Sequence, residues 1–199
     1  MSVSVQTADF DVGAEMTALS AGRDDVGAVA SFVGLVRADG RGKEGVEKVG
    51  TPRVLPAGRA DEPTALQGGR AKDALLAVAD GETATNAKNT VSEAVAAMTL
   101  EHYPGMTEHA LADIVAEAHT RWPLQAVRVI HRVGRLLPGE RIVFVGVAAG
   151  HRGDAFAACE FIMDYLKTRA PFWKKEETPQ GARWVDARDS DDAAAARWA

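Results

Sequence analysis

The stretch AVRVIHRVGRLLPGERIVFVGVAA, residues 126–149, decides the fold. Its two halves, residues 126–136 and 140–149, are rich in valine and isoleucine, which favour β-strands. Leu137-Pro138-Gly139 lies between them and is typical of a turn. Because so short a connection joins antiparallel strands, the stretch predicts an antiparallel hairpin.

The segments on either side of this hairpin predict further strands and two helices. The apolar run at residues 26–37 predicts a buried strand, and residues 98–106 predict another that ends at Pro104-Gly105. Apolar side chains at helical spacing predict a helix in residues 107–122, with Thr107 as N-cap, and a second helix in residues 155–170. The core positions expected on these helices are Leu111, Ile114, Val115, Ala118 and Trp122, then Phe156, Cys159, Ile162, Met163 and Leu166.

After the second helix, residues 164–188 gather basic side chains around two tryptophans and two prolines. Pro171 and Pro179 break any long helix, so we expect a helix end, a loop and a short strand. The whole order predicts an α+β protein with a mainly antiparallel sheet and packed helices.

Residues 38–97 differ in composition from the rest of the chain. They are rich in glycine, alanine, lysine, glutamate and threonine and contain no aromatic residue, so they can bury little apolar surface. We therefore predict one domain formed by residues 1–37 and 98–199, with residues 38–97 as a loosely packed or disordered insertion.

Charge and composition exclude some classes of function. The 199 residues carry a formal net charge of -5, which argues against a general nucleic-acid binder. No secretion signal and no apolar run of membrane-spanning length is visible, so we expect a soluble, cytoplasmic protein that binds no membrane. Local basic clusters in an acidic chain favour a small anionic ligand or a peptide carboxylate.

Three places could hold such a ligand. His151 and Arg152 lie between an apolar strand and a helix start, where free backbone N–H groups favour an anion. Lys167 and Lys174 flank the rigid turn at Pro171, and two ammonium groups brought close could handle protons. Arg37 ends the first predicted strand. Each place also has a plain structural explanation: a capped helix start, lysines at a helix C-terminus, and a charge at a strand end.

Other reactive residue types form no recognisable pattern. Cys159 falls on the apolar face of its helix, which favours a core position over a nucleophile. The histidines show no metal-ligand spacing, and we expect no metal site. Trp122, Trp173 and Trp184 are each interpreted as core or rim packing.

Taken together, these pieces resemble the large, catalytic subunit of molybdopterin synthase. The resemblance covers residues 26–37 and 98–198, and its most specific block is FIMDYLKTRAPFWKKEETPQGARWVDAR, residues 161–188. It implies an α/β hammerhead-type fold and an enzyme that adds two sulfurs to cyclic pyranopterin monophosphate, forming the dithiolene of molybdopterin. It implies that a thiocarboxylate on the C-terminal Gly-Gly of a small ubiquitin-like partner supplies the sulfur, so neither a cofactor nor a catalytic cysteine is expected.

The resemblance also implies the roles of individual residues. Lys167 and Lys174 match the catalytic lysines of the family. The matched substrate-binding positions, which include both lysines, are Leu35, Val36, Arg37, His151, Arg152, Lys167, Lys174, Lys175, Glu176 and Arg188. A homodimer of large subunits with one small subunit on each is the implied assembly.

One departure from the family is the insertion at residues 38–97, which is far longer than the loop expected there. Two other functions compete with this one. A non-catalytic binding scaffold derived from the family would have no need for both lysines with His151 and Arg152. A hydrolase of small phosphate esters lacks visible metal ligands or a nucleophile.

Overall fold

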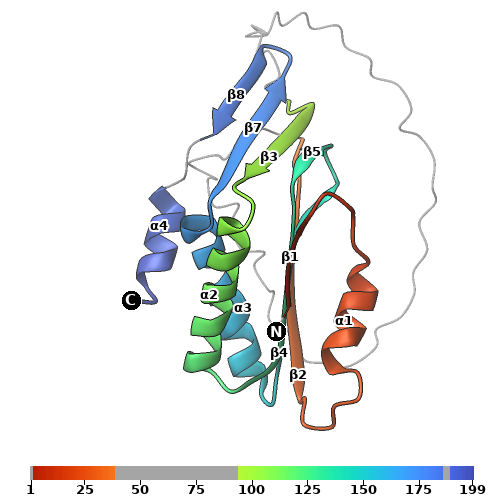
Figure 1. Cartoon of the computed structure of the whole chain (residues 1–199), viewed down its shortest axis with the longest axis vertical. Coiled ribbons are helices and arrows are strands. Elements are labelled where there is room, and N and C mark those ends of the chain that lie inside the picture. The colour runs from red at the N-terminus through yellow and green to blue at the C-terminus, as the bar shows by residue number, and fades with distance from the viewer. Residues whose placement is uncertain (1, 39–93, 186–188) are drawn as a thin grey trace, which may run out of the picture. The chain divides into compact units, whose positions relative to one another are not determined.

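The computed structural model describes residues 2–38, 94–185 and 189–199. The predicted α+β class is confirmed: the described residues form two four-stranded sheets and four helices (Figure 1). Their order is β1 (Ser2–Gln6), α1 (Val12–Ser20), β2 (Ala28–Leu35), β3 (Ala97–His102), α2 (Met106–Arg121), β4 (Leu124–Arg132), β5 (Gly134–Leu136), β6 (Arg141–Ala149), α3 (Arg152–Arg169), β7 (Phe172–Thr178), β8 (Gly181–Val185) and α4 (Asp189–Ala196).

The first sheet has the strand order β1-β4-β6-β2. The predicted hairpin is present, since β4 and β6 pair antiparallel with Val129 opposite Val145. The first predicted strand, however, ends early. Gly134 has a φ of 87°, a left-handed conformation that glycine adopts easily, and the chain turns there away from β4. Gly134–Leu136 then forms the separate strand β5, which pairs with β3 in the second sheet.

The second sheet has the order β5-β3-β7-β8, and all of its pairs are antiparallel. The sequence predicted a loop and one short strand after α3, but the chain forms a hairpin of two strands, β7 and β8. Pro179 lies in the turn between them, where it removes no hydrogen bond from a strand interior. The basic segment therefore begins in the last turns of α3 and continues as these two strands (Figure 1).

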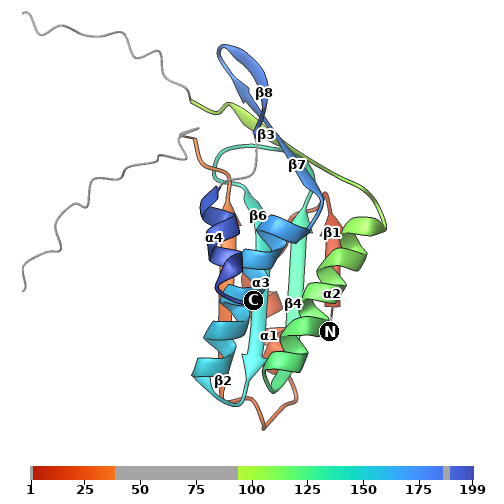
Figure 2. The same cartoon turned by 90° about the vertical axis from the view of Figure 1, so that its left-hand side faces the viewer.

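The helices cover both faces of the first sheet. α2 and α3 pack on one face around a core that includes Val115, Phe161 and Ile162, and α1 packs on the other against Phe144 and Ile130 (Figure 2). Two local predictions were wrong. α2 begins at Met106 with Gly105 as N-cap, because the positive φ of Gly105 starts the turn before Thr107, whose buried hydroxyl donates to the Tyr103 carbonyl. Phe156 is 66% exposed rather than in the core.

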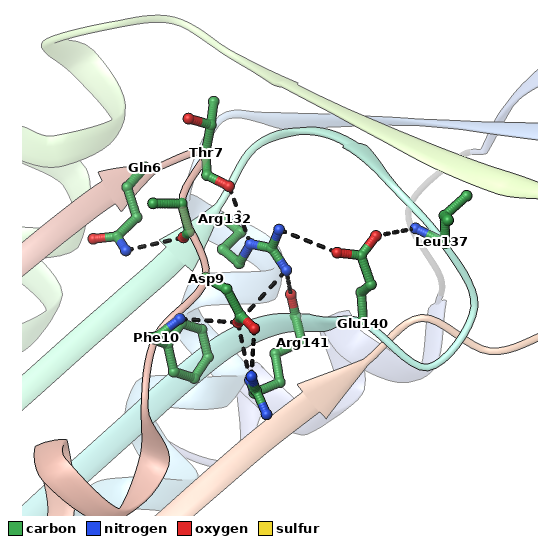
Figure 3. Close-up of polar contacts among 9 residues, drawn as sticks. Gln6, Thr7, Asp9, Phe10, Arg132, Leu137, Glu140 and Arg141 are labelled. Carbon is green, nitrogen blue, oxygen red and sulfur yellow. Dashed lines mark hydrogen bonds and ion pairs between the residues drawn. The ribbon is translucent and has the colours of Figure 1, made fainter.

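A polar network fixes the ends of β4 and β6 nearest β5 (Figure 3). The buried guanidinium of Arg132 donates to the carbonyl oxygens of Thr7 and Arg141 and to the carboxylate of Glu140. Asp9 pairs with Arg141 and lies 3.6 Å from Arg132. Because a buried guanidinium is stable only when its donors are satisfied, this network holds Arg132 and its backbone in one position.

The predicted insertion falls mostly on residues 39–93, which lie outside the described residues. The residues on either side of this segment are described, and they contact each other: the backbone N–H of Val95 donates to the carbonyl of Ala38 at 2.7 Å. The chain thus leaves and re-enters at one place, and the predicted division into domain and insertion stays a prediction. Within the described ranges, no helix is long and apolar enough to cross a membrane.

Candidate active site

A cavity of about 280 Å³ lies where the two sheets meet the C-terminal half of α3. Most of its wall is apolar, and its polar residues come from β4, α3 and β7 and from the segment that follows β2. The lining residues are Phe32, Gly34, Leu35, Arg37, Met98, Leu100, His131, Ile142, Val143, Met163, Leu166, Lys167, Lys174 and Glu176. An apolar cavity with a few convergent charged groups is the usual form of a small-molecule site.

The alternation of side chains along β7 decides which of its basic residues reach this cavity. Lys174 and Glu176 lie opposite Leu100 and Met98 of β3, and all four line the cavity. Lys175 lies between them on the other face of the strand. Its ammonium is 5.4 Å from the ring centroid of Trp184. The predicted contact of Lys175 with the site is therefore not seen in this chain.

Each of the two predicted catalytic lysines has a carboxylate partner. Lys174 Nζ lies 3.0 Å from the buried carboxylate of Glu176, which also pairs with Arg183 at 3.3 Å. Lys167 Nζ lies 3.3 Å from Asp191 of α4. α3 and β7 thus bring both lysines to one cavity, and each ammonium is paired with a carboxylate.

Residues at the end of β2 supply the next side of the cavity. Leu35 and Arg37, two of the predicted substrate-binding residues, both line it. Val36 is buried in a small core cluster with Met98, Leu100 and Leu136, and it is not among the residues that line the cavity.

His151 and Arg152 lie at the opposite end of the same elements. β2 pairs with β6 from Ala28 opposite Ala149 to Leu35 opposite Arg141, and His151 follows the Ala149 end. Lys167 comes 15 residues after Arg152 on α3. At about 1.5 Å per residue, this separates them by about 22 Å along the helix. Within one chain, then, the structure does not bring these two residues to the cavity. Arg188 lies outside the described residues.

Cys159 behaves as predicted. Its side chain is buried in the main core, and burial raises the pKa of its thiol to about 11. A thiol that stays protonated is a poor nucleophile. The tryptophans differ from one another: Trp122 packs against Phe161, whereas Trp173 and Trp184 are about half exposed on the β7–β8 hairpin and so lie outside the core.

Sequence reasoning assigned no role to two polar residues at the site. His131 occupies an apolar strand, where a lone histidine gives no local signal of a site. Asp191 belongs to a run of aspartates near the end of the chain, which on its own is typical of a solvated segment. Only the packing of distant elements reveals that His131 borders the cavity and that Asp191 contacts Lys167.

Comparison with known proteins identifies similar sequences and folds. A family model described as MoaE protein matches residues 82–169. The molybdopterin synthase catalytic subunit of Ralstonia nicotianae is 50% identical over 198 residues, which are 98% of this chain and 83% of that protein. A solved molybdopterin biosynthesis MoaE protein from Burkholderia ambifaria is 47% identical with a TM-score of 0.63, covering 99% of this chain and 97% of that chain. A Helicobacter pylori structure, a complex of subunits 1 and 2 of molybdopterin-converting factor, shares the fold at 14% identity and a TM-score of 0.56, covering 94% of this chain and 91% of that chain.

Proposed function

The chain belongs to the family of molybdopterin synthase catalytic subunits, and on that premise we propose that the cavity bounded by Arg37, Lys167 and Lys174 is its active site. The family enzyme acts in the biosynthesis of the molybdenum cofactor, and the resemblance found in the sequence is confirmed. The observation that carries the proposal is the convergence of three cations on one apolar-walled cavity: Arg37 from the segment after β2, Lys167 from α3 and Lys174 from β7.

The proposed reaction is the transfer of sulfur to cyclic pyranopterin monophosphate from a C-terminal thiocarboxylate: the sulfur bonds to the pterin and displaces an oxygen substituent, and water then cleaves the acyl C–S bond, so that the donor leaves as a carboxylate. The guanidinium of Arg37 suits the phosphate of the pterin, since arginine binds phosphate through two parallel hydrogen bonds. Lys167 and Lys174 suit the anionic thiocarboxylate and the negative charge that develops when its sulfur attacks the pterin. Because apolar walls keep water away, these charges act more strongly on the reacting atoms than they would in solution.

The proposed sulfur donor is a separate small, ubiquitin-like subunit that ends in Gly-Gly. The Helicobacter pylori protein of the same fold is a complex of two subunits, which supports a two-subunit enzyme here. A Gly-Gly tail has no side chains and fits a narrow channel, so we propose that it enters the cavity until its terminal sulfur lies between the two lysines. We expect the assembly to work in the cytoplasm.

We also propose the homodimer, because it would reconcile the predicted roles of His151 and Arg152 with their distance from Lys167. β2 is an edge strand of its sheet among the described residues. Phe32 and Phe156 are exposed beside it, and they border a hollow of about 410 Å³. If two copies met antiparallel along this edge, the Ala28 end of one β2 would lie near the Leu35 end of the other. His151 and Arg152 of one copy would then approach the cavity of its partner.

Reconstitution tests the proposed reaction. The protein is mixed with thiocarboxylated small subunit and cyclic pyranopterin monophosphate, and the dithiolene product is measured. We expect product with the wild type. The Arg37→Ala variant should raise KM with a smaller change in kcat, because a phosphate contact is made in both the ground state and the transition state. An unchanged KM would contradict the proposed contact between Arg37 and the phosphate.

Mixing two variants, at a pterin concentration too low for either variant alone to show activity, tests the shared site. Arg37→Ala and Arg152→Ala proteins are combined and allowed to exchange protomers. If each site uses Arg37 of one copy and Arg152 of the other, every mixed dimer regains one intact site. About a quarter of wild-type activity should then return. Activity that stays at the average of the two variants would show that the two arginines act within one chain or not together.

A further inference from the structure

His131 of β4 is a polar residue of the cavity wall that the proposed reaction does not use. Its side chain is buried, and it lines the same cavity as Arg37, Lys167 and Lys174. A buried imidazole favours its neutral form, because a positive charge on the ring would lose its hydration.

The hydrogen bond at Nδ1 fixes the form of the ring. Nδ1 lies 2.9 Å from the carbonyl oxygen of Arg132, and a carbonyl can only accept, so Nδ1 carries the hydrogen. Burial lowers the pKa of His131 to about 4, so the ring is neutral near pH 7. In a neutral ring with hydrogen on Nδ1, the other nitrogen, Nε2, holds a lone pair and accepts.

Two contacts hold the ring in place. It stacks on Phe172 at the start of β7, with 3.7 Å between the ring centroids and 18° between the planes. The Arg132 carbonyl that receives the Nδ1 hydrogen belongs to the residue whose guanidinium is fixed by the network of Figure 3. The direction in which Nε2 points is therefore set before any ligand arrives, which is how binding sites gain selectivity at low entropic cost.

Among the described residues, the hydrogen bond of the His131 side chain is made by Nδ1, and Nε2 has no partner. It is also not among the described side-chain atoms that are both buried and unpartnered, which are His102 Nδ1, His119 Nε2 and Gln125 Oε1. An unpartnered nitrogen that is not fully buried can be reached by a ligand. Since His131 lines the cavity, a ligand in the cavity can reach Nε2.

The other polar side chains of the cavity are less suited to accept a hydrogen bond from a ligand. Arg37, Lys167 and Lys174 only donate hydrogen bonds. The carboxylate of Glu176 already receives Lys174 and Arg183. A phosphate and a thiocarboxylate need donors, and the cations supply them, but a pterin ring also carries N–H groups that need an acceptor.

We propose that Nε2 of His131 accepts a hydrogen bond from an N–H group of the pterin substrate and so determines how the ring lies in the cavity. This inference rests on the proposed active site. It adds to that site a substrate-binding residue that fixes orientation through a hydrogen bond, whereas the cations bind charge.

Binding of cyclic pyranopterin monophosphate to the homodimer without small subunit tests the proposal. His131→Phe keeps a flat ring for the stack on Phe172 and removes the acceptor. We expect its Kd to rise by about tenfold, the size expected for one buried hydrogen bond. His131→Gln can place an amide oxygen near the position of Nε2 and should recover most of the affinity. Phe172→Leu removes the stack but keeps the acceptor and should change Kd less than His131→Phe does.

A spectroscopic measurement on the wild type avoids any doubt about folding. The imidazole ¹⁵N spectrum of the free protein should show hydrogen on Nδ1 of His131, and added substrate should shift the Nε2 resonance in the direction of an accepted hydrogen bond. An unmoved Nε2 resonance with saturating substrate would overturn the proposal. Equal losses in Phe172→Leu and His131→Phe would also overturn it, since His131 would then act only through the stack.

The remaining outcomes separate this inference from the active site itself. His131→Phe could leave pterin affinity unchanged and weaken binding of the small subunit. Nε2 would then accept its hydrogen bond from the backbone of the Gly-Gly tail, which would contradict the proposal. Unchanged pterin affinity in His131→Phe but loss in Arg37→Ala would contradict the role of His131 and leave the site standing. No loss in either variant would contradict the site as well.

Discussion

Lys174 Nζ lies 3.0 Å from Oε1 of Glu176, two residues further along β7. The carboxylate is only 4% exposed, and its other oxygen faces Arg183 at 3.3 Å. One buried negative charge thus holds two cations from neighbouring strands. A buried charge is tolerated only when it is paired, so Glu176 and Lys174 depend on each other for their positions.

Replacing Glu176 with Gln should lower kcat by roughly tenfold or more, about 1.4 kcal/mol of barrier. The amide keeps the shape but cannot balance the charges of Lys174 and Arg183, so the ammonium moves away from its position in the cavity. Steady-state kinetics and melting temperature are the measurements. Glu177→Gln is the matched control, because Glu177 pairs with Arg135 on the other face of β7. Equal effects in the two variants would mean that the loss is one of general stability.

Lys167→Ala and Lys174→Ala should each reduce product formation by about 10²–10⁴-fold, as is usual for positioned acid–base groups. The double variant should lose less than the product of the two single effects if the lysines act as a unit. Single-turnover assays with thiocarboxylated small subunit measure this. Arg169→Ala offers a control, since Arg169 ends the same helix but pairs with Glu117. A folded Lys167→Ala enzyme with wild-type activity would refute the assignment.

Asp9→Asn should lower the free energy of unfolding at pH 7, but not at pH 2. Hydrogen bonds from Arg141 and from the backbone N–H of Phe10 lower the pKa of Asp9 from 3.8 to about 2. A lowered carboxyl pKa contributes stability above pH 3.8 that is lost as pH falls toward 2. Because Asp9 is about half exposed, the effect should stay below about 1 kcal/mol. Denaturant titrations of both proteins across this pH range are the test, and a pH-independent difference would exclude the ion pair as its cause.

His131 should make the fold sensitive to mild acid. Burial is the main cause that lowers its pKa from 6.5 to about 4, and nearby His102 adds a smaller effect. The neutral ring is stable in the fold, so stability is complete above pH 6.5 and falls as pH drops toward 4. This loss is on the order of 2–3 kcal/mol at the acid end. Relative to wild type, His131→Phe should therefore gain stability between pH 6.5 and 4. Parallel pH curves for the two proteins would contradict the assigned shift.

Deletion of residues 40–93, with a short Gly-Ser linker in their place, should leave a folded protein. Val95 N–H donates to the Ala38 carbonyl, so a few residues can span the gap. Shortening a loop changes its closure entropy only slowly with length. We expect activity to fall less than about tenfold, since Arg37 adjoins the new loop. Melting temperature and pull-down of the small subunit are the measurements. An unfolded or non-binding product would show that the segment is structural.

Much of the fold follows from local pattern in the sequence. The hairpin of β4 and β6 and the cores of α2 and α3 were predicted because apolar spacing and turn residues act over short range. β5 was missed because three residues carry too little pattern to be separated from β4. The β7–β8 hairpin was missed because its strands are polar and half exposed, and only pairing with β3 shows that they belong to a sheet.

The candidate site was likewise predictable from the sequence only in part. The sequence placed both lysines and Arg37 in one site through a family resemblance, and the cavity gathers these three residues. It could not exclude Val36 or Lys175, because the face on which a strand residue lies depends on register, and a shift of one residue reverses it. The sequence also could not show that His151 and Arg152 lie far from Lys167 within one chain, since that distance depends on how α3 packs in the fold.

The sequence by itself determined the family, the α+β class and the residue types that meet at the site, because these depend on composition, periodicity and motifs that are visible locally. Only the tertiary structure decided that Glu176 and Asp191 hold the two lysines and that His131 presents an acceptor to the same cavity. Those relationships join residues from β4, α3, β7 and α4. They arise when apolar faces pack and bring distant polar groups within hydrogen-bonding range, and the sequence carries no local mark of which polar groups will meet.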